Sequence, residues 1–340
     1  MSRIPATVVT GFLGSGKTTL IRHILEHADG RRIALVINEF GDLGVDGELI
    51  RGCGDALCRE EDMIELSNGC ICCTVADDFL PAMERLLDRP DPPDHIVIET
   101  SGLALPQPLL RAFAWPGVAG RVTVDGVVTV VDGAALAEGR FAGDEDAVAS
   151  ARAGLEGADH DSPLRELFED QLACADLVVL NKADLLEPEA AEALAASLRA
   201  GARPGVRALP ARHGALPLGV LLGLGVGAEA EDRRAPHHDG EDDHDHDEFE
   251  SFVVDLPGEE ADPAALAARV RAAVAAHGIL RLKGFAAVAG KPLRLAVQAA
   301  GPRVETRFDR PWGDAPRRTR LVVIGEAGLD RPAIEAALAP

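Results

Sequence analysis

The sequence has little positive charge: its 340 residues include 34 Lys and Arg residues against 56 Asp and Glu residues. The formal net charge at pH 7 is −22. Phosphate backbones select basic surfaces, so this excess of acid argues against nucleic acid as a partner. Hydrophobic residues make up 47% of the chain, which is ample for packed cores, and the length suits one large domain plus a smaller one.

Long apolar runs are also missing. The longest run, residues 216–226, is too short and too rich in glycine to span a bilayer. The N-terminal residues MSRIPATVVTGF contain no apolar leader segment and no small-residue cleavage site. We therefore expect a cytoplasmic protein with no membrane partner.

Cysteine is scarce, yet three of the six cysteines, Cys70, Cys72 and Cys73, fall within the stretch LSNGCICCTVADD. The chain has no second dense cluster to pair with them, and the cytoplasm keeps thiols reduced, which disfavours a disulfide. Two of the three thiolates can reach one metal ion, and such ligands suit tetrahedral Zn²⁺ or Co²⁺. Buried structural cysteines and a redox pair are the alternatives.

The other three cysteines are isolated from this group. Cys53 and Cys58 lie in GCGDALC and are either auxiliary metal ligands or, more simply, loop residues. Cys174 follows an amphipathic stretch just ahead of an apolar run, so we expect it in the core.

A phosphate-binding pattern stands near the N-terminus, where residues 11–18 read GFLGSGKT. The apolar run 4–9 precedes it and a helical spacing of apolar residues follows it, which is the strand–loop–helix context that the pattern requires. The pattern assigns the following residues to nucleotide binding: Gly11, Gly14, Ser15, Gly16, Lys17, Thr18 and Thr19. Lys17 is expected to reach the β- and γ-phosphates, and the Thr18 hydroxyl is expected to coordinate Mg²⁺.

The run LVVLNKAD, residues 177–184, indicates which base is bound. It reads as a buried strand that ends in Asn181, Lys182 and Asp184. A carboxylate there accepts hydrogen bonds from the guanine N1–H and exocyclic amine, a pair that adenine does not offer, so GTP is expected over ATP. Residues 209–214, LPARHG, are a weak candidate for a further guanine contact.

A third strand-like run, HIVIETSG at residues 95–102, ends in Glu99 and Gly102. A carboxylate at this place orients Mg²⁺ through water, and the glycine N–H senses the γ-phosphate. Lys17 and Glu99 are thus the candidate catalytic residues. Leu103 stands where a switch of the Ras type has a water-orienting glutamine, so we expect slow intrinsic hydrolysis.

Apolar segments alternate with helical patterns through the first two thirds of the chain. The expected strands are 4–10, 33–38, 95–100, 127–132 and 177–182, and helical spacing is found in residues 18–28, 79–87 and 188–200. This alternation predicts an α/β fold: a P-loop NTPase domain over residues 1–228, with a mainly parallel sheet covered by helices on both faces. All the nucleotide motifs fall at the carboxyl ends of the expected strands.

Residues 229–248 differ from everything around them: ten acidic residues are interleaved with two arginines and with His237, His238, His244 and His246. Such a stretch cannot bury apolar surface, so we expect a disordered linker. The histidines either serve a plain solvated spacer or form a local metal reservoir that raises the metal concentration near the cysteines.

A small α+β domain is expected over residues 249–340. Its strands are 250–257, 279–288, 292–299 and 319–325, with a hairpin turn at Gly290 and Lys291. Asp262 and Pro263 begin a helix that Gly278 ends, and a closing helix starts at about residue 331. The domain carries no catalytic constellation, so partner recognition or control of the GTPase is its expected role.

Taken in order, the segments GFLGSGKTT, NEFGDLGVDGE, NGCICCTV, IETSGLA and NKADLL resemble the CobW family of GTP-dependent metallochaperones. Residues 279–285 and 307–312 resemble that family's second domain, so the likeness covers nearly the whole chain. Residues 165–186 look like the CobW subgroup that is associated with aerobic cobalamin synthesis and Co²⁺ delivery.

The resemblance implies that GTP and Mg²⁺ organise the loop of Cys70, Cys72 and Cys73 into a metal site, with Glu39 as a further candidate ligand. Hydrolysis would then release the ion to a client protein, for cobalamin the cobaltochelatase, from a monomer or a nucleotide-dependent dimer. The same residues would serve a zinc chaperone. A metal buffer with a nucleotide-sensing domain and a P-loop kinase or synthetase are the alternatives from other classes.

Overall fold

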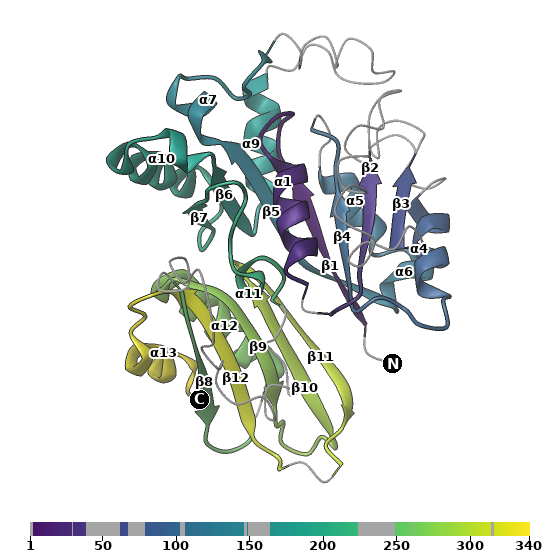
Figure 1. Ribbon diagram of the computed structural model, residues 1–340. Coiled ribbons are helices and arrows are strands. Elements are labelled where there is room, and N and C mark those ends of the chain that lie inside the picture. The colour runs from purple at the N-terminus through teal and green to yellow at the C-terminus, as the bar shows by residue number, and fades with distance from the viewer. Residues whose placement is uncertain are drawn as a thin grey trace. The chain divides into compact units, whose positions relative to one another are not determined.

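The computed structural model describes residues 3–28, 30–38, 62–66, 79–102, 106–145, 148, 164–223, 249–260, 262–313 and 316–340 (Figure 1). The chain forms two compact units, one of residues 1–203 and 208–215 and one of residues 204–207 and 216–340. No helix among the described residues is long and apolar enough to cross a membrane.

The first unit contains the following elements: β1 (Ile4–Thr10), α1 (Lys17–Glu26), β2 (Ile33–Asn38), β3 (Met63–Leu66), α4 (Leu80–Leu87), β4 (His95–Glu99), α5 (Pro106–Ala112), α6 (Pro116–Ala119), β5 (Val122–Asp132), α7 (Gly133–Ala137), α9 (Leu164–Cys174), β6 (Leu177–Asn181), the 3₁₀ helix η3 (Ala183–Leu185), α10 (Pro188–Gly201) and β7 (Arg207–Pro210). The strands form one seven-stranded sheet in the order β3-β2-β4-β1-β5-β6-β7. The strand pairs from β3 through β6 are parallel. The predicted α/β class with a mainly parallel sheet is confirmed.

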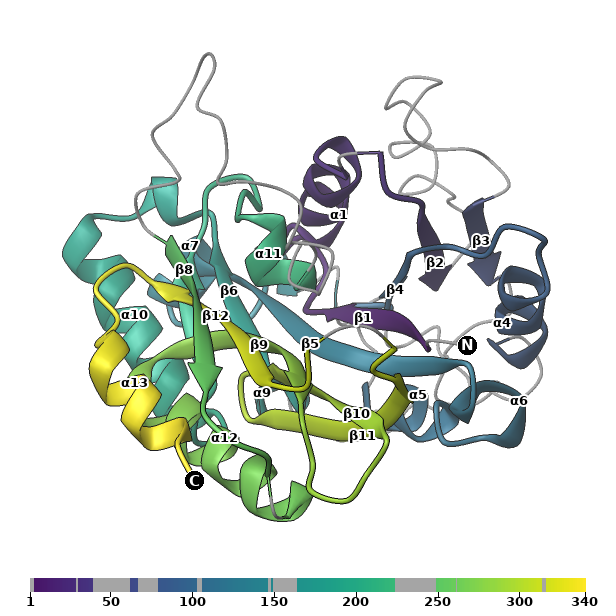
Figure 2. The same cartoon turned by 90° about the horizontal axis from the view of Figure 1, so that it is seen from below.

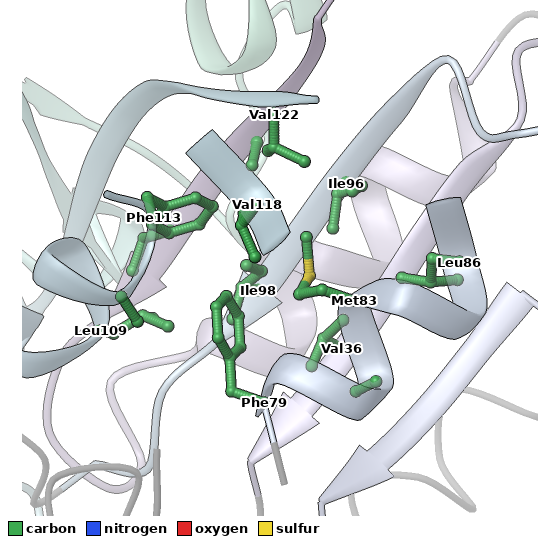
Figure 3. Packing of buried hydrophobic residues seen from close by; sticks show 14 of the residues in the cluster. Val36, Phe79, Met83, Leu86, Ile96, Ile98, Leu109, Phe113, Val118 and Val122 are labelled. Atoms are coloured by element: carbon green, nitrogen blue, oxygen red, sulfur yellow. The ribbon is translucent and has the colours of Figure 1, made fainter. Parts of the chain in front are cut away.

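Helices lie on both faces of this sheet, as Figure 2 shows for α1 on one side and α5 and α6 on the other. The packing in Figure 3 explains why: one face buries Phe79 and Met83 against Ile96 and Ile98 of β4. These four side chains are completely buried, and Phe79 also meets the Phe113 ring edge-on at 5.5 Å. Strands buried on both faces read as continuous apolar runs, which is why the sequence showed them.

Strand β5 begins at Val122, five residues before the expected start at residue 127. Asp125 and Gly126 hid this part of the strand, because neither residue is typical of a strand interior. The register explains their presence: Ala6 pairs with Val124 and Thr7 with Gly126, so Asp125 is the extra residue of a bulge.

The second unit contains α11 (Leu218–Leu222), β8 (Phe249–Leu256), α12 (Pro263–His277), β9 (Ile279–Ala286), β10 (Leu293–Ala300), β11 (Arg303–Pro311), β12 (Thr319–Glu326) and α13 (Arg331–Leu338). Its strands form an antiparallel sheet in the order β11-β10-β9-β12-β8. The small α+β domain is thus present, with β11 as a strand that the expected list lacked. The Asp262 carboxylate accepts a hydrogen bond from the Ala264 N–H and Gly278 has a φ of 73°, so α12 starts and stops at the expected residues.

The two units divide before residue 216, whereas the sequence placed the domain boundary at 228, which lies outside the described residues. Helix α11 belongs to the second unit because Arg281 of β9, 2% exposed, donates to the carbonyls of Val220 and Leu221. The Val220 contact measures 2.8 Å. The acidic segment 229–248, with His237, His238, His244 and His246, lies outside the described residues.

Candidate functional site

The loop between β1 and α1 is held in a tight curl by its glycines. Gly11, Gly14 and Gly16 have φ values of 138°, 75° and 102°, which residues with a side chain rarely adopt. A Cβ at Gly11 would lie 2.1 Å from the Val130 carbonyl oxygen, and one at Gly16 would lie 2.1 Å from Asn181 Nδ2. The glycine spacing is therefore a steric requirement of this backbone.

Lys17 is the first residue of α1 and is 7% exposed. Its ammonium group donates to the carbonyls of Gly11 at 2.9 Å and Phe12 at 3.2 Å, both within the loop itself. A cation held in the mouth of the loop, together with the N-terminus of α1, makes a site that favours anions.

The three hydroxyl residues of the loop differ in exposure. Ser15 is 1% exposed, Thr18 is half-buried and Thr19 is exposed. Ser15 Oγ is buried and makes no hydrogen bond within the part of the chain that the structure describes. A buried hydroxyl in that position fits a phosphate oxygen, because buried polar groups are normally hydrogen-bonded.

Asn181 joins two loops that are far apart in the sequence. Its Nδ2 donates to the Ser15 carbonyl at 2.9 Å, and its Oδ1 accepts from the Gly214 N–H at 2.9 Å. The residue is 2% exposed at the carboxyl end of β6. One buried amide thus fixes the phosphate loop against the 211–214 loop, part of the LPARHG segment that was a weak candidate for a guanine contact.

Lys182 follows in a left-handed conformation, with a φ of 60°. Its ammonium group contacts the Asp132 carboxylate at 2.6 Å. Asp132 is 2% exposed at the end of β5, and its other oxygen accepts from the Ala135 N–H at 3.1 Å, which caps α7. Asp132 was not among the residues predicted from the sequence; its only local signal is that it ends the apolar run of β5.

Asp184 lies in η3 and is exposed, whereas the rest of the motif is buried or half-buried. The backbone around it is fixed, because the Ala183 N–H donates to the Ala211 carbonyl at 3.0 Å. An exposed carboxylate on a held turn is suited to accept hydrogen bonds from a ligand, and guanine offers the matching donors.

Glu99 ends β4 between the two strands that flank it, opposite Val9 of β1 and Ile37 of β2. It is 4% exposed. Beyond it, the Thr100 N–H donates to the Val9 carbonyl at 2.9 Å, so the chain stays attached to β1 up to the phosphate loop. A carboxylate here, with the Thr18 hydroxyl, gives the oxygen donors that Mg²⁺ prefers.

Gly102 lies against the phosphate loop: a Cβ there would be 2.6 Å from the Leu13 backbone nitrogen. Its carbonyl accepts from the buried Gln171 Nε2 at 3.4 Å. Gln171 of α9, completely buried, is a second residue that the sequence analysis did not find. The structure therefore brings Gly102 next to the loop that precedes Lys17.

The candidate metal ligands Cys70, Cys72, Cys73 and Glu39 lie outside the described residues, as do Cys53, Cys58 and Leu103. Within the described ranges, no group of three or more His, Cys, Asp or Glu side chains could hold a metal ion. Cys174 ends α9 and packs against the hydrophobic cluster shown in Figure 3, but it is only partly buried and so lies at the edge of the core in which we expected it.

Two family profiles together match most of the chain: "CobW/HypB/UreG, nucleotide-binding domain" over residues 5–205 and "Cobalamin synthesis protein cobW C-terminal domain" over residues 249–340. A "Zinc chaperone CobW" from Sinorhizobium sp. is 56% identical over 99% of this chain and 96% of its own length. The protein of the same name from Pseudomonas aeruginosa is 52% identical over 98% of this chain and 90% of its own length. A crystal structure of the Zn(II)-bound YjiA GTPase from E. coli is 26% identical, covers 99% of this chain and 98% of that chain, and has a TM-score of 0.42.

Proposed function

The chain belongs to the CobW/HypB/UreG family of nucleotide-binding proteins, and on that premise we propose that it is a GTPase metallochaperone. It would bind a divalent metal in its GTP state and pass the ion to a client protein after hydrolysis. The observation that carries the nucleotide half of this proposal is the Asn181 amide, which holds the phosphate loop and the 211–214 loop together. This link holds the loop expected to bind the phosphates and the loops expected to bind the base in a fixed position relative to each other.

The residues around the nucleotide have distinct roles in this proposal. Lys17 leaves the carbonyls of its own loop and neutralises the phosphates, with the loop N–H groups and the α1 N-terminus as further donors. Asp184 accepts from the guanine edge and so discriminates GTP from ATP. Thr18 and Glu99 would hold Mg²⁺, which supplies charge neutralisation at the β- and γ-phosphates when it is bound.

The metal half of the proposal rests on Cys70, Cys72 and Cys73, with Glu39 as a further candidate ligand. Their sequence segments lie next to two strands: NEFGDLG begins at Asn38, the last residue of β2, and NGCICCT begins at Asn68, two residues after the end of β3. The carboxyl ends of parallel strands meet at one edge of a sheet, which is also the edge of the phosphate loop. Nucleotide and metal would therefore bind at the same edge of the sheet.

Two metals are candidates. Our sequence-based expectation is Co²⁺ for cobalamin synthesis, with cobaltochelatase as the client. Zn²⁺ is the second candidate, because the two relatives above carry the name zinc chaperone. Thiolate ligands accept both ions, and Zn²⁺ lies above Co²⁺ in the usual affinity order, so selectivity has to come from geometry and supply.

A cobalt titration followed by visible absorption tests the proposal. It is run with Mg²⁺ and a slowly hydrolysed GTP analogue, with Mg²⁺ and GDP, and without nucleotide. We expect intense bands of tetrahedral thiolate-bound Co²⁺ only with the GTP analogue, and their loss in a Cys70/Cys72/Cys73→Ser variant. Equal bands in all three states would leave a metal buffer and end the chaperone proposal.

A zinc competition in the same cuvette separates the two metals. Zn²⁺ is added to the Co²⁺-loaded GTP-analogue state at a free concentration held by a chelator. Loss of the bands at free Zn²⁺ levels far below the Co²⁺ level is the outcome that the usual affinity order predicts, so it would leave the choice between the two metals to cellular supply. Persistence of the bands under a matched excess of free Zn²⁺ would favour cobalt.

A further inference from the structure

Two histidines lie one turn apart at the carboxyl end of α1. His23 lies in the last turn of α1 and His27 is the C-cap, four residues further on, so the two rings lie side by side. Their ring centroids are 4.2 Å apart and the ring planes are tilted by 39°. His27 is exposed and His23 is half-buried, so the pair is open to solvent.

The His27 ring has a fixed tautomer. Its Nδ1 lies 2.8 Å from the His23 carbonyl oxygen, and a carbonyl oxygen can only accept, so Nδ1 carries the hydrogen. In the neutral ring the lone pair is then on Nε2. This is the arrangement found in metal-bound histidines, which donate one ring N–H to a carbonyl or carboxylate while the other nitrogen binds the ion.

The helix that carries the pair is firmly held. Leu20, Ile21 and Ile24 of α1 are completely buried, and Leu25 is 3% exposed. The His27 N–H donates to the His23 carbonyl at 3.2 Å, so the last turn is closed at this residue. A held backbone keeps two imidazoles together at little entropic cost, which favours chelation.

We propose that His23 and His27 form a binding site for a divalent transition-metal ion, with water in the remaining coordination positions. Two imidazoles at i and i+4 are a proven pair of zinc ligands on a helix, and imidazole also suits Ni²⁺, Cu²⁺ and Co²⁺. Mg²⁺ and Ca²⁺ prefer oxygen and are excluded. Two protein ligands make an exchangeable site, since structural zinc sites use four.

The site is distinct from the nucleotide and cysteine regions. Lys17 and Thr18 begin α1, and a helix rises 1.5 Å per residue, so His27 lies about 15 Å along the axis from Lys17. It therefore lies away from the phosphate-binding end of the helix. Metal binding here needs no nucleotide, and the inference stands or falls independently of the proposed function.

A helix-end role is the competing explanation, because a histidine in the last turn interacts favourably with the helix dipole. His277 provides the matched control. It is the last residue of its helix, α12, as His27 is the C-cap of α1, but Ala273 stands four residues before His277, so no histidine pair is formed there. A dipole effect alone would treat His27 and His277 alike, whereas a metal site requires the pair.

The test is a Ni²⁺ titration of the full chain by calorimetry, without nucleotide. The parent carries Cys70, Cys72 and Cys73 as serine and the four linker histidines as glutamine, which removes the clustered thiols and the linker imidazoles. His23→Gln and His27→Asn are then added singly; asparagine can keep the donor to the His23 carbonyl. Loss of a residue that only orients a metal ligand typically weakens metal binding by roughly 10- to 100-fold. Each of these substitutions removes a ligand itself, so we expect at least this loss of Ni²⁺ affinity. His277→Asn should leave the affinity unchanged.

A second measurement uses the unmodified chain, in case the multiply substituted parent does not fold. Equilibrium dialysis against Ni²⁺ should give one ion fewer per chain for His23→Gln than for the wild type, with His277→Asn equal to the wild type. Equal stoichiometry in wild type and His23→Gln would overturn the site, as would equal affinity in the calorimetric series. In that case the histidines only stabilise the end of α1.

Discussion

At the scale of single residues, the nucleotide motifs are held by neighbours that lie far away in the sequence. Asn181 reaches Ser15 and Gly214, while Lys182 reaches Asp132. The sequence motifs identify the residues that are expected to contact the ligand. The structure also shows which residues hold those side chains in position, and Asp132, which pairs with Lys182, is the main one.

Asp132→Asn should weaken guanine-nucleotide binding. Asparagine is nearly isosteric and its oxygen can still cap Ala135, so the change removes mainly the charge that holds Lys182. Hydrogen bonds to charged groups are worth about 1.5–3 kcal/mol, and we expect a loss at the lower end of this range because Lys182 is half-buried. Calorimetric titration with GDP and with a GTP analogue measures the change.

Asp176 gives the control for that substitution. It is equally buried at 2% exposed, receives the Val127 N–H at 2.9 Å and pairs with Arg203 at 2.7 Å, but it precedes β6 instead of following it. Asp176→Asn should cost stability and leave the nucleotide affinity of the folded protein unchanged. Equal losses of affinity in both variants would mean that Asp132 acts on stability alone.

Gly102→Ala tests how closely β4's extension approaches the phosphate loop. The added methyl would meet the Leu13 nitrogen at 2.6 Å, and backbone atoms cannot move aside cheaply. Overpacking of this kind typically costs about 1–3 kcal/mol of stability. We expect the phosphate loop to shift in response and GTP binding to weaken. Affinity and single-turnover hydrolysis are the measurements.

Gly120→Ala is the corresponding control, because its φ is −80° and its Cβ would meet no heavy atom within 4 Å. We expect it to bind and hydrolyse GTP as the wild type does. A Gly102→Ala variant with wild-type affinity and hydrolysis would show that the loop adjusts freely.

At the scale of elements, α11 shows how a short helix is assigned to a unit. Its five residues are too few to be stable alone, since isolated helices need about 12–15 residues. Its last carbonyls are taken up by the guanidinium of Arg281, a fully buried side chain of β9. This contact, and not the local sequence, places α11 in the second unit.

Arg281→Met should therefore destabilise the second unit. Methionine fills similar volume but leaves the carbonyls of Val220 and Leu221 without this donor, which costs about 1–3 kcal/mol for a buried group. Arg310→Met, in the same sheet, is the comparison: its side chain is exposed and its contact to Asp309 is 4.0 Å long, so about 0–1 kcal/mol is expected. Urea unfolding measures both, and equal midpoints would contradict the role of Arg281.

At the scale of the whole molecule, the chain has two compact units, each with its own buried core. The nucleotide motifs all lie in the first unit, whereas the second contains the antiparallel sheet with α12 and α13. Ligand binding stabilises only the folded unit that holds the ligand.

Calorimetry should therefore show two unfolding transitions, of which Mg²⁺ and a GTP analogue raise only one. A ligand at 100 times its dissociation constant adds about 2.7 kcal/mol to the stability of the unit that binds it. Arg281→Met should lower the other transition. A single transition that shifts as a whole would show that the units unfold together.

The sequence by itself determined the α/β class, the order of the nucleotide motifs and both ends of α12, because each depends on short-range rules: glycine positions, apolar runs and helix caps. Tertiary structure alone decided the extension of β5 through the bulge at Asp125, the roles of Asp132 and Gln171, and the assignment of α11 to the second unit. Each of these depends on a contact between residues distant along the chain or on strand register, and neither leaves a local pattern. The His23–His27 pair is different, because its spacing lies within the helix that the sequence predicts over residues 18–28; the structure adds only that the two rings lie 4.2 Å apart and that His27 Nδ1 is bonded to the His23 carbonyl.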